Sequence, residues 1–279
     1  MPREAPRLKA PPDACDTHMH VYDRRYPTAA TAKMNPPDAS VAEYLAMCRR
    51  IGIERTVVVQ ASTYGTDNRC MLAAMAELGA DRARGVAVVD DSVSDAELER
   101  LTKAGIRGIR FFMLPGGALS WDILEKMSAR VAPFGWHVQL QLDGQDLPER
   151  EALIRRVQTT LVIDHNGKFL EPVPVTHRAF QVLLRLVESG RTYVKLSAPY
   201  ETSKLGPPGY DDVSTLAKAL VRAGPERMLW ASNWPHPSTP PERRPDDADL
   251  LDLLLDWAPD EATRAKILVS NPARLYGFS

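Results

Sequence analysis

Short runs of β-branched and aromatic residues alternate with longer amphipathic segments along the whole chain. The runs are continuously apolar, which is typical of strands buried on both faces of a parallel sheet. A glycine often separates an amphipathic segment from the next run, as Gly52, Gly105 and Gly190 do, and glycine in this place commonly ends a helix. The pattern predicts strands at residues 15–21, 56–60, 86–89, 106–112, 136–142, 161–163, 193–196 and 228–230.

The amphipathic segments have the length and spacing of helices. The first opens with Ser40 and Glu43 in a capping-box pattern. The predicted helices are residues 40–50, 67–78, 94–103, 120–131, 146–157, 176–188, 211–222 and 260–269, with an extra one at 246–257. Eight strand–helix units predict a (β/α)8 TIM barrel that forms a single domain over residues 1–279. An open doubly wound sheet is the alternative, although no GxGxxG motif follows a strand.

Composition narrows the possible partners. A net charge of −1 and the lack of a basic tract predict no nucleic-acid partner. Nothing approaches 18 consecutive apolar residues, so we expect no membrane span. Three scattered cysteines and a polar, proline-rich beginning without an apolar leader indicate a cytoplasmic protein.

Histidines gather where the predicted strands end. His18, His20, His165 and His236 follow strands, whereas His137 begins a strand and His177 begins a helix. Catalytic groups of TIM barrels lie at the carboxyl ends of the strands. The first four therefore indicate a site rather than a core of hydrogen-bonded histidines, and the other two are expected to be structural.

Strand periodicity orients some of these side chains. His18 and His20 are two residues apart, so they share one face of the first strand, with Asp16 below them. Asp164 alternates to the face opposite His165. Further polar residues at strand ends are candidates for the site: Asn68, Arg110, Gln141, Asp143, Lys168, Glu201 and Asn233. The alternative for Arg110 is a helix cap or an ion pair with Glu125.

Five motifs, read together, resemble one enzyme superfamily. They are residues 16–20 (DTHMH), 59–68, 163–167 (IDHNG), 230–236 (WASNWPH) and 271–276 (NPARLY). Together the motifs span nearly the whole chain, and the chain resembles the amidohydrolase superfamily. Its nearest resemblance is to a largely metal-independent branch that includes pyrone-dicarboxylate lactonases and isomerases of sugar-diacid lactones.

The expected function depends on positions where this chain differs from the superfamily pattern. Hydrolytic members have an aspartate after the last strand that deprotonates water, and Asn233 stands there. Metal-binding members add a histidine and a lysine or glutamate, where this chain has Gln141 and Arg110. The resemblance therefore implies that no metal or other cofactor is used. It also implies that His18 and His20 donate hydrogen bonds to a substrate carbonyl.

We accordingly expect an isomerase that acts on a lactone of a sugar diacid, of the D-galactarolactone type. It would interconvert the 1,5- and 1,4-lactones by intramolecular acyl transfer. The residues that the resemblance implies for catalysis are His18, His20, His165 and Asn233, with His165 or His20 as the proton shuttle. Those implied for binding a small acidic lactone are Arg110 and Lys168 for the carboxylate, Asn68, Asp143 and Glu201 for hydroxyls, and Gln141 and His236. A lactonase and a non-catalytic sugar-acid-binding barrel are the alternatives.

Overall fold

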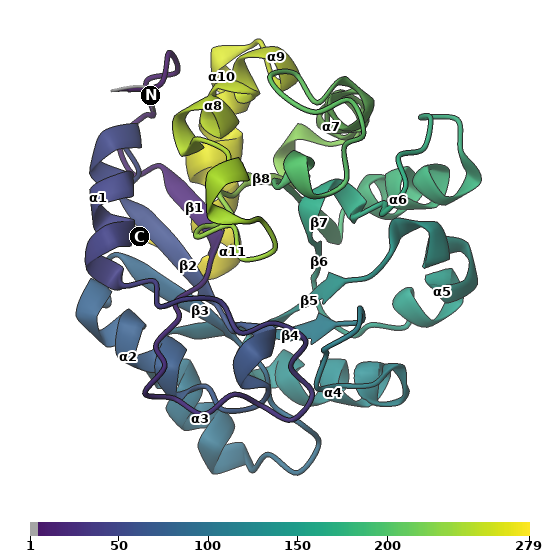
Figure 1. The fold of residues 1–279 in the computed structure, drawn as a ribbon. Helices are drawn as coiled ribbons and strands as arrows, with labels where there is room; N and C mark the ends of the chain where they lie inside the picture. The colour runs from purple at the N-terminus through teal and green to yellow at the C-terminus, as the bar shows by residue number, and fades with distance from the viewer. Residues whose placement is uncertain (1–4) are drawn as a thin grey trace.

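Eight parallel strands form the centre of the molecule (Figure 1), in the computed structural model that describes residues 5–279. Each strand pairs with the next one along the chain. The sheet closes into a barrel where the end of its first strand meets the segment after its last strand. There Met19 forms a parallel bridge with Trp234, and the His20 amide donates to Trp234 O at 2.8 Å. The strands are β1 Cys15–Met19, β2 Arg55–Val59, β3 Ala83–Ala87, β4 Ile106–Phe112, β5 His137–Gln141, β6 Leu161–Ile163, β7 Thr192–Leu196 and β8 Met228–Trp230. The predicted (β/α)8 barrel is confirmed.

Helices surround the barrel and fill the connections between its strands (Figure 1). They are α1 Val41–Ile51, α2 Arg69–Leu78, α3 Asp95–Lys103, α4 Leu124–Val131, α5 Leu147–Ile154, α6 Arg178–Glu188, α7 Asp211–Ala223, α8 Asp247–Asp252, α9 Leu254–Trp257, α10 Glu261–Ala265 and α11 Asn271–Tyr276. The Ser40–Glu43 capping box is present at α1. Among the described residues, no helix combines the length and apolar character that a membrane crossing requires.

The end of the chain differs from the prediction. The predicted helix ends at residue 269, but the chain continues through a π-helical segment, Lys266–Ser270, into α11. Pro272 does not end this run; it lies in the first turn of α11, directly after the π-helical segment.

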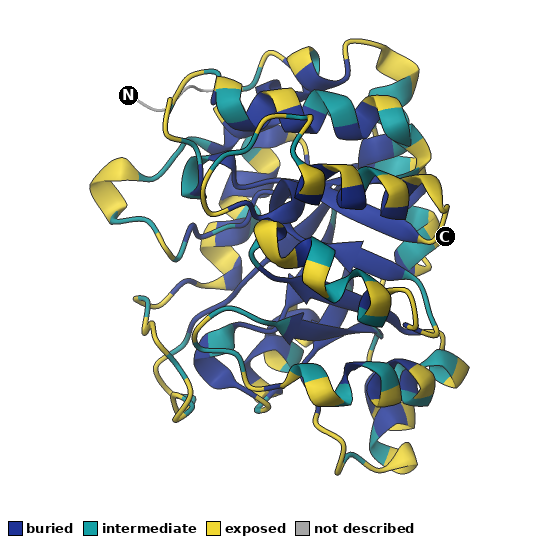
Figure 2. Ribbon diagram, turned by 90° about the vertical axis from the view of Figure 1, so that its right-hand side faces the viewer, coloured by how far each residue is buried: buried dark blue, intermediate teal, exposed yellow. Residues whose placement is uncertain are grey.

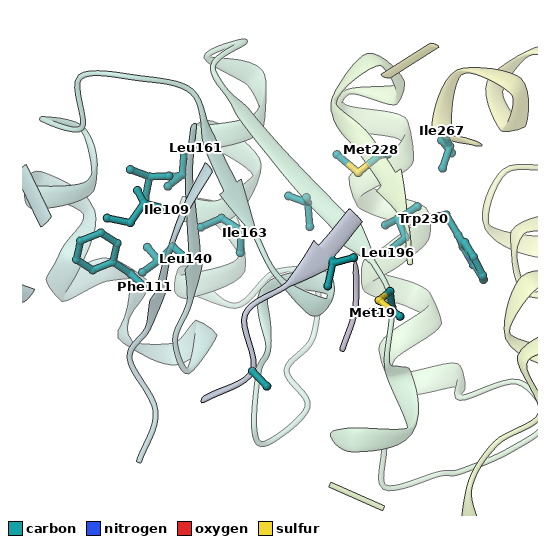
Figure 3. Packing of buried hydrophobic residues seen from close by; sticks show 14 of the residues in the cluster. Met19, Ile109, Phe111, Leu140, Leu161, Ile163, Leu196, Met228, Trp230 and Ile267 are labelled. Atoms are coloured by element: carbon teal, nitrogen blue, oxygen red, sulfur yellow. The ribbon is translucent and has the colours of Figure 1, made fainter. Parts of the chain in front are cut away.

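The outward faces of the strands pack against the helices. Figure 3 shows part of this layer, in which Ile109, Phe111, Leu140, Ile163 and Trp230 are buried. The strands are buried while the outer surfaces of the helices are exposed (Figure 2). This arrangement explains the continuously apolar runs in the sequence, because each strand contacts helices on one face and the barrel interior on the other.

The barrel interior changes from apolar to polar along its axis. A separate apolar cluster contains alternate strand residues, including Val57, Val162 and Leu229, together with Tyr276 of α11. Further along the strands, inward positions carry buried polar groups such as Lys195. Such groups inside a barrel require partners, and these partners form the site described next.

Candidate active site

A cavity of about 330 Å³ lies at the carboxyl ends of the strands. Seven of the predicted site residues line it: His20, Arg110, Gln141, His165, Lys168, Glu201 and Asn233. Apolar side chains such as Phe112 and Leu114 complete the wall, and Lys33 and Met34 reach it from the loop after β1. The size suits a small organic acid.

His18 and His20 point toward each other, with their Nε2 atoms 3.1 Å apart. His20 Nδ1 lies 2.8 Å from Val59 O, which can only accept, so this nitrogen carries the proton. Burial lowers the pKa of His20 to about 3 and that of His18 well below its usual range, so both rings are neutral. His20 Nε2 is then an acceptor, and the N–H between the rings belongs to His18 Nε2.

Asp16 does not lie below the two histidines, contrary to the expectation from strand alternation. Strand β1 shifts register between Asp16 and Met19, which breaks the period of two. The Asp16 carboxylate accepts hydrogen bonds from Tyr44 OH and Ser232. It therefore ties β1 to helix α1 and to the segment after β8.

Asp164 lies at the centre of the buried polar groups, and the prediction that it faces away from the site is wrong. Its Oδ1 lies 3.3 Å from His18 Nδ1 and 3.6 Å from Lys195 Nζ, and its Oδ2 accepts from Gln139 Nε2 at 3.1 Å. Burial alone would raise the pKa of Asp164, but the Lys195 ammonium beside it holds that pKa well below its usual range. The alternation fails because β6 ends at Ile163 and the chain turns at once.

His165 presents a free base to the cavity. Its Nδ1 lies 2.8 Å from Ser197 Oγ, which donates in turn to Lys195 O at 3.4 Å. Because that carbonyl only accepts, we assign the His165 proton to Nδ1, where the serine hydroxyl can accept it, and this leaves Nε2 unprotonated. Burial lowers the pKa of His165 to about 4, so the ring is neutral at pH 7.

Arg110 is held in the cavity wall by neutral groups. Its Nη1 donates to Gln60 O at 2.8 Å and its Nη2 to Gln141 Oε1 at 2.9 Å, while the nearest carboxylate, that of Asp164, is 4.0 Å away. It neither caps a helix nor pairs with Glu125, whose partner is Arg156.

Lys168 and Glu201 form a buried ion pair on another side of the cavity. Glu201 also accepts from Ser238 Oγ and, at 3.3 Å, from Asn233 Nδ2. Burial opposes ionisation of Glu201, yet Lys168 lowers its pKa to about 2. Asn233 Nδ2 donates to Tyr200 OH as well, at 2.9 Å, so the amide is oriented by two partners.

Three predicted binding residues, and the catalytic candidate His18, lie outside the cavity wall, and their contact with a substrate stays a prediction. Asn68 Nδ2 donates to Val88 O at 2.8 Å, and Asn68 Oδ1 accepts from Val88 N at 3.0 Å, so the backbone of Val88 occupies both ends of the amide. Asp143 caps the turn that follows β5. His236 stands behind Tyr200, with Nδ1 2.8 Å from its hydroxyl and Nε2 3.2 Å from Asp247.

Two residues of the site were not singled out from the sequence. Tyr22 and Ser238 both line the cavity. Tyr22 continues the spacing of two that relates His18 to His20, so this signal was present in the sequence. Nothing in the local sequence marks Ser238, whose role depends on its contact with Glu201.

Two structural histidines agree with expectation. His137 begins β5 and is buried against Tyr276, with ring centroids 5.2 Å apart. His177 is the N-cap of α6, where Nδ1 accepts from the Ala179 amide at 3.3 Å. Neither ring reaches the cavity wall.

The donor set does not suit a divalent cation. Among residues 5–279, one group of possible ligands has its atoms within 4.8 Å of one another: His18, Asp164 and His165. Asp164 already faces the cations Lys195 and Arg110, and Asn233 supplies an amide, which is a weak ligand, where a further carboxylate would be needed. Two cations beside the only carboxylate of the group oppose the binding of a third.

Comparison with known proteins agrees with the fold and the motifs. A family model described as Amidohydrolase matches residues 15–278. The chain is 34% identical to the D-galactarolactone isomerase of Agrobacterium fabrum, over 99% of this chain and 94% of that protein. It is 38% identical to a 2-pyrone-4,6-dicarboxylate hydrolase of Comamonas testosteroni, over 97% and 92%. A ligand-free crystal structure from Agrobacterium tumefaciens superimposes with a TM-score of 0.93 at 34% identity, over 99% of both chains. The protein described here is therefore a (β/α)8 enzyme of the amidohydrolase family.

Proposed function

We propose that this enzyme interconverts the 1,5- and 1,4-lactones of a sugar diacid, of the D-galactarolactone type, by intramolecular acyl transfer. The observation that carries the proposal is the state of Asn233. Its amide nitrogen is held by Tyr200 and Glu201, and a neutral amide cannot take a proton from water. A lactone bound here would lack the carboxylate base that hydrolytic members of the superfamily carry after the last strand, and its own hydroxyl, held near the carbonyl, would be the favoured nucleophile.

The charges of the cavity support a substrate with one free carboxylate. Of the cations in the wall, Lys168 is already neutralised by Glu201 and Lys33 is exposed to solvent. Arg110 is buried, is bound by uncharged oxygens and can form a two-pronged contact with a carboxylate. The expected grip by both cations is therefore revised to Arg110 alone. A diacid lactone has a single free carboxylate, because the other forms the ring. We assign Glu201, which lines the cavity, as an acceptor for sugar hydroxyls.

The reaction needs one bond to form and one to break at the same carbon. The substrate hydroxyl oxygen bonds to the lactone carbonyl carbon, and the bond from that carbon to the ring oxygen breaks. The proton of the attacking hydroxyl must reach the departing oxygen. His165 Nε2 is unprotonated and lines the cavity, so we assign this transfer to His165 rather than His20, whose two nitrogens are both engaged.

The remaining catalytic contribution is positioning. Holding the hydroxyl near the carbonyl makes the attack intramolecular, which supplies a large part of the rate. The His18 Nε2–H is the donor of the histidine pair, and a carbonyl oxygen entering beside His20 would share it.

Hydrolysis of a small acidic lactone is the second candidate, because the chain is also 38% identical to a pyrone-dicarboxylate hydrolase. Incubation with D-galactaro-1,5-lactone, followed by NMR, separates the two. We expect the 1,4-lactone. Open-chain diacid as the first product would replace our proposal with the lactonase, and an unchanged spectrum would exclude this substrate for both.

Activity should not depend on a metal ion. After treatment with a chelator and dialysis, we expect the same kcat/KM as before, because Asp164 is committed to Lys195 and Gln139. Metal content of the dialysed sample is measured in parallel as the control. Loss of activity that added zinc restores would show that the polar cluster does hold a cation.

A further inference from the structure

Lys195 has no exposed surface and lies inside the barrel on β7. Its Nζ donates to Thr17 O at 2.8 Å and to Gln139 Oε1 at 2.7 Å, and His18 Nδ1 is 3.3 Å away. An ammonium group has three hydrogens and no lone pair. In each of these contacts Lys195 is therefore the donor, and His18 Nδ1 is an acceptor.

We propose that Lys195 is a positioning residue that keeps the proton of neutral His18 on Nε2. The hydrogen bonds then form a chain with one direction, from Lys195 to His18, from His18 to His20, and from His20 to Val59 O. Both ends of the chain are fixed, because an ammonium only donates and a carbonyl only accepts. The chain points the N–H of the fully buried His18 at His20, which lines the cavity where the lactone carbonyl is expected.

Asp164 is the group that would reverse this arrangement. Its Oδ1 lies 3.3 Å from the same His18 Nδ1 and 3.6 Å from Lys195 Nζ. Without Lys195, the strongest partner of His18 Nδ1 would be this carboxylate, which attracts a proton to Nδ1. A neutral His18 would then turn a lone pair toward the lone pair of His20 Nε2, and the donor for the carbonyl would be lost.

The proton position can be read directly from the ring nitrogens. We would record long-range ¹⁵N–¹H NMR spectra of the whole enzyme without substrate and assign the His18 signals with a His18→Gln variant. The expected spectrum shows a neutral His18 with its proton on Nε2. A proton on Nδ1, or a charged ring, in the unmodified enzyme would overturn the proposal even if no Lys195 variant folds.

Lys195→Met provides the second measurement. We expect the His18 signals to move to those of an Nδ1–H or charged ring, whereas the His165 signals, governed by Ser197, stay in place as an internal control. An unmoved His18 in the folded variant would contradict the proposal.

The kinetic consequence rests on the lactone reaction proposed above, whereas the proton position does not. For Lys195→Met we expect kcat to fall by about 10²–10³-fold with little change in KM, as when one oxyanion donor is removed. A fall in melting temperature with kcat retained would mean that Lys195 is only structural. If the enzyme does not act on the lactone, the ring spectra still decide where the proton lies.

Discussion

Replacing Arg110 with alanine should lower kcat/KM for the lactone acid by roughly 30- to several-thousand-fold. This corresponds to a loss of about 2–5 kcal/mol of transition-state stabilisation. Arg110 is the cation of the cavity wall that neutral groups hold in place. Its loss leaves the substrate carboxylate buried without a charged partner, in a cavity where Glu201 is also negative. The measurement is steady-state kinetics on the folded fraction, together with the melting temperature.

Arg107→Ala is the matched control on the same strand. Arg107 is half-buried toward the other end of β4 and donates to the carbonyls of Thr102 and Ile106. We expect it to lower stability without changing kinetics. A methyl ester of the lactone tests the charge itself, because the difference between the parent enzyme and Arg110→Ala should largely disappear with this neutral substrate. An equal loss on acid and ester would mean that Arg110 shapes the cavity and does not bind the carboxylate.

The architecture could be predicted because it depends on patterns that repeat along the chain. Continuous apolar runs separated by amphipathic segments are a direct consequence of strands that are covered on both faces. Local departures were not visible in the same pattern. The register shift in β1 that turns Asp16 toward Tyr44 depends on pairing with β2, and the helical run through Pro272 depends on a π-helical turn before it.

The position of the site followed from the fold, but the pairing of its side chains did not. His20, His165 and Asn233 could be placed together because parallel strands of a barrel end on one face. The Lys168–Glu201 ion pair joins loops 33 residues apart, and its existence decides that Lys168 is not free for the substrate. Asn68 looks equally suitable in the sequence, yet its amide is consumed by the backbone of Val88.

Backbone conformation is a further property that the sequence did not reveal. His165 and Asn233 both have positive φ angles, of 52° and 60°. This region is uncommon for residues other than glycine and costs on the order of 1–3 kcal/mol each when it is imposed by the surrounding structure. These are the residues to which we assign proton transfer and the suppression of hydrolysis, and the unusual backbone sets where their side chains point.

Asn233→Asp should convert the isomerase into an enzyme that also hydrolyses its lactone. The substitution hardly changes the volume of the side chain, so the lactone should still bind. Tyr200 OH, which now accepts from Asn233 at 2.9 Å, can rotate to donate to the new carboxylate. A bound water would then have a carboxylate base of its own at position 233, and it would compete with the substrate hydroxyl for the same carbonyl carbon. NMR of the products should show open-chain diacid beside the isomerised lactone.

The pH dependence of this hydrolysis follows from Glu201. The Asn233 nitrogen lies 3.3 Å from Glu201 Oε1, so a carboxylate there would have a like charge beside it, and its pKa would rise above the ordinary value of about 3.9. Only the ionised form is a base, so hydrolysis should increase as pH rises through that raised pKa. Adding Glu201→Gln removes the repulsion and should move the rise to lower pH. If the unmodified enzyme hydrolyses the lactone as fast as Asn233→Asp does, Asn233 does not decide between the two reactions, and the isomerase proposal loses its main support.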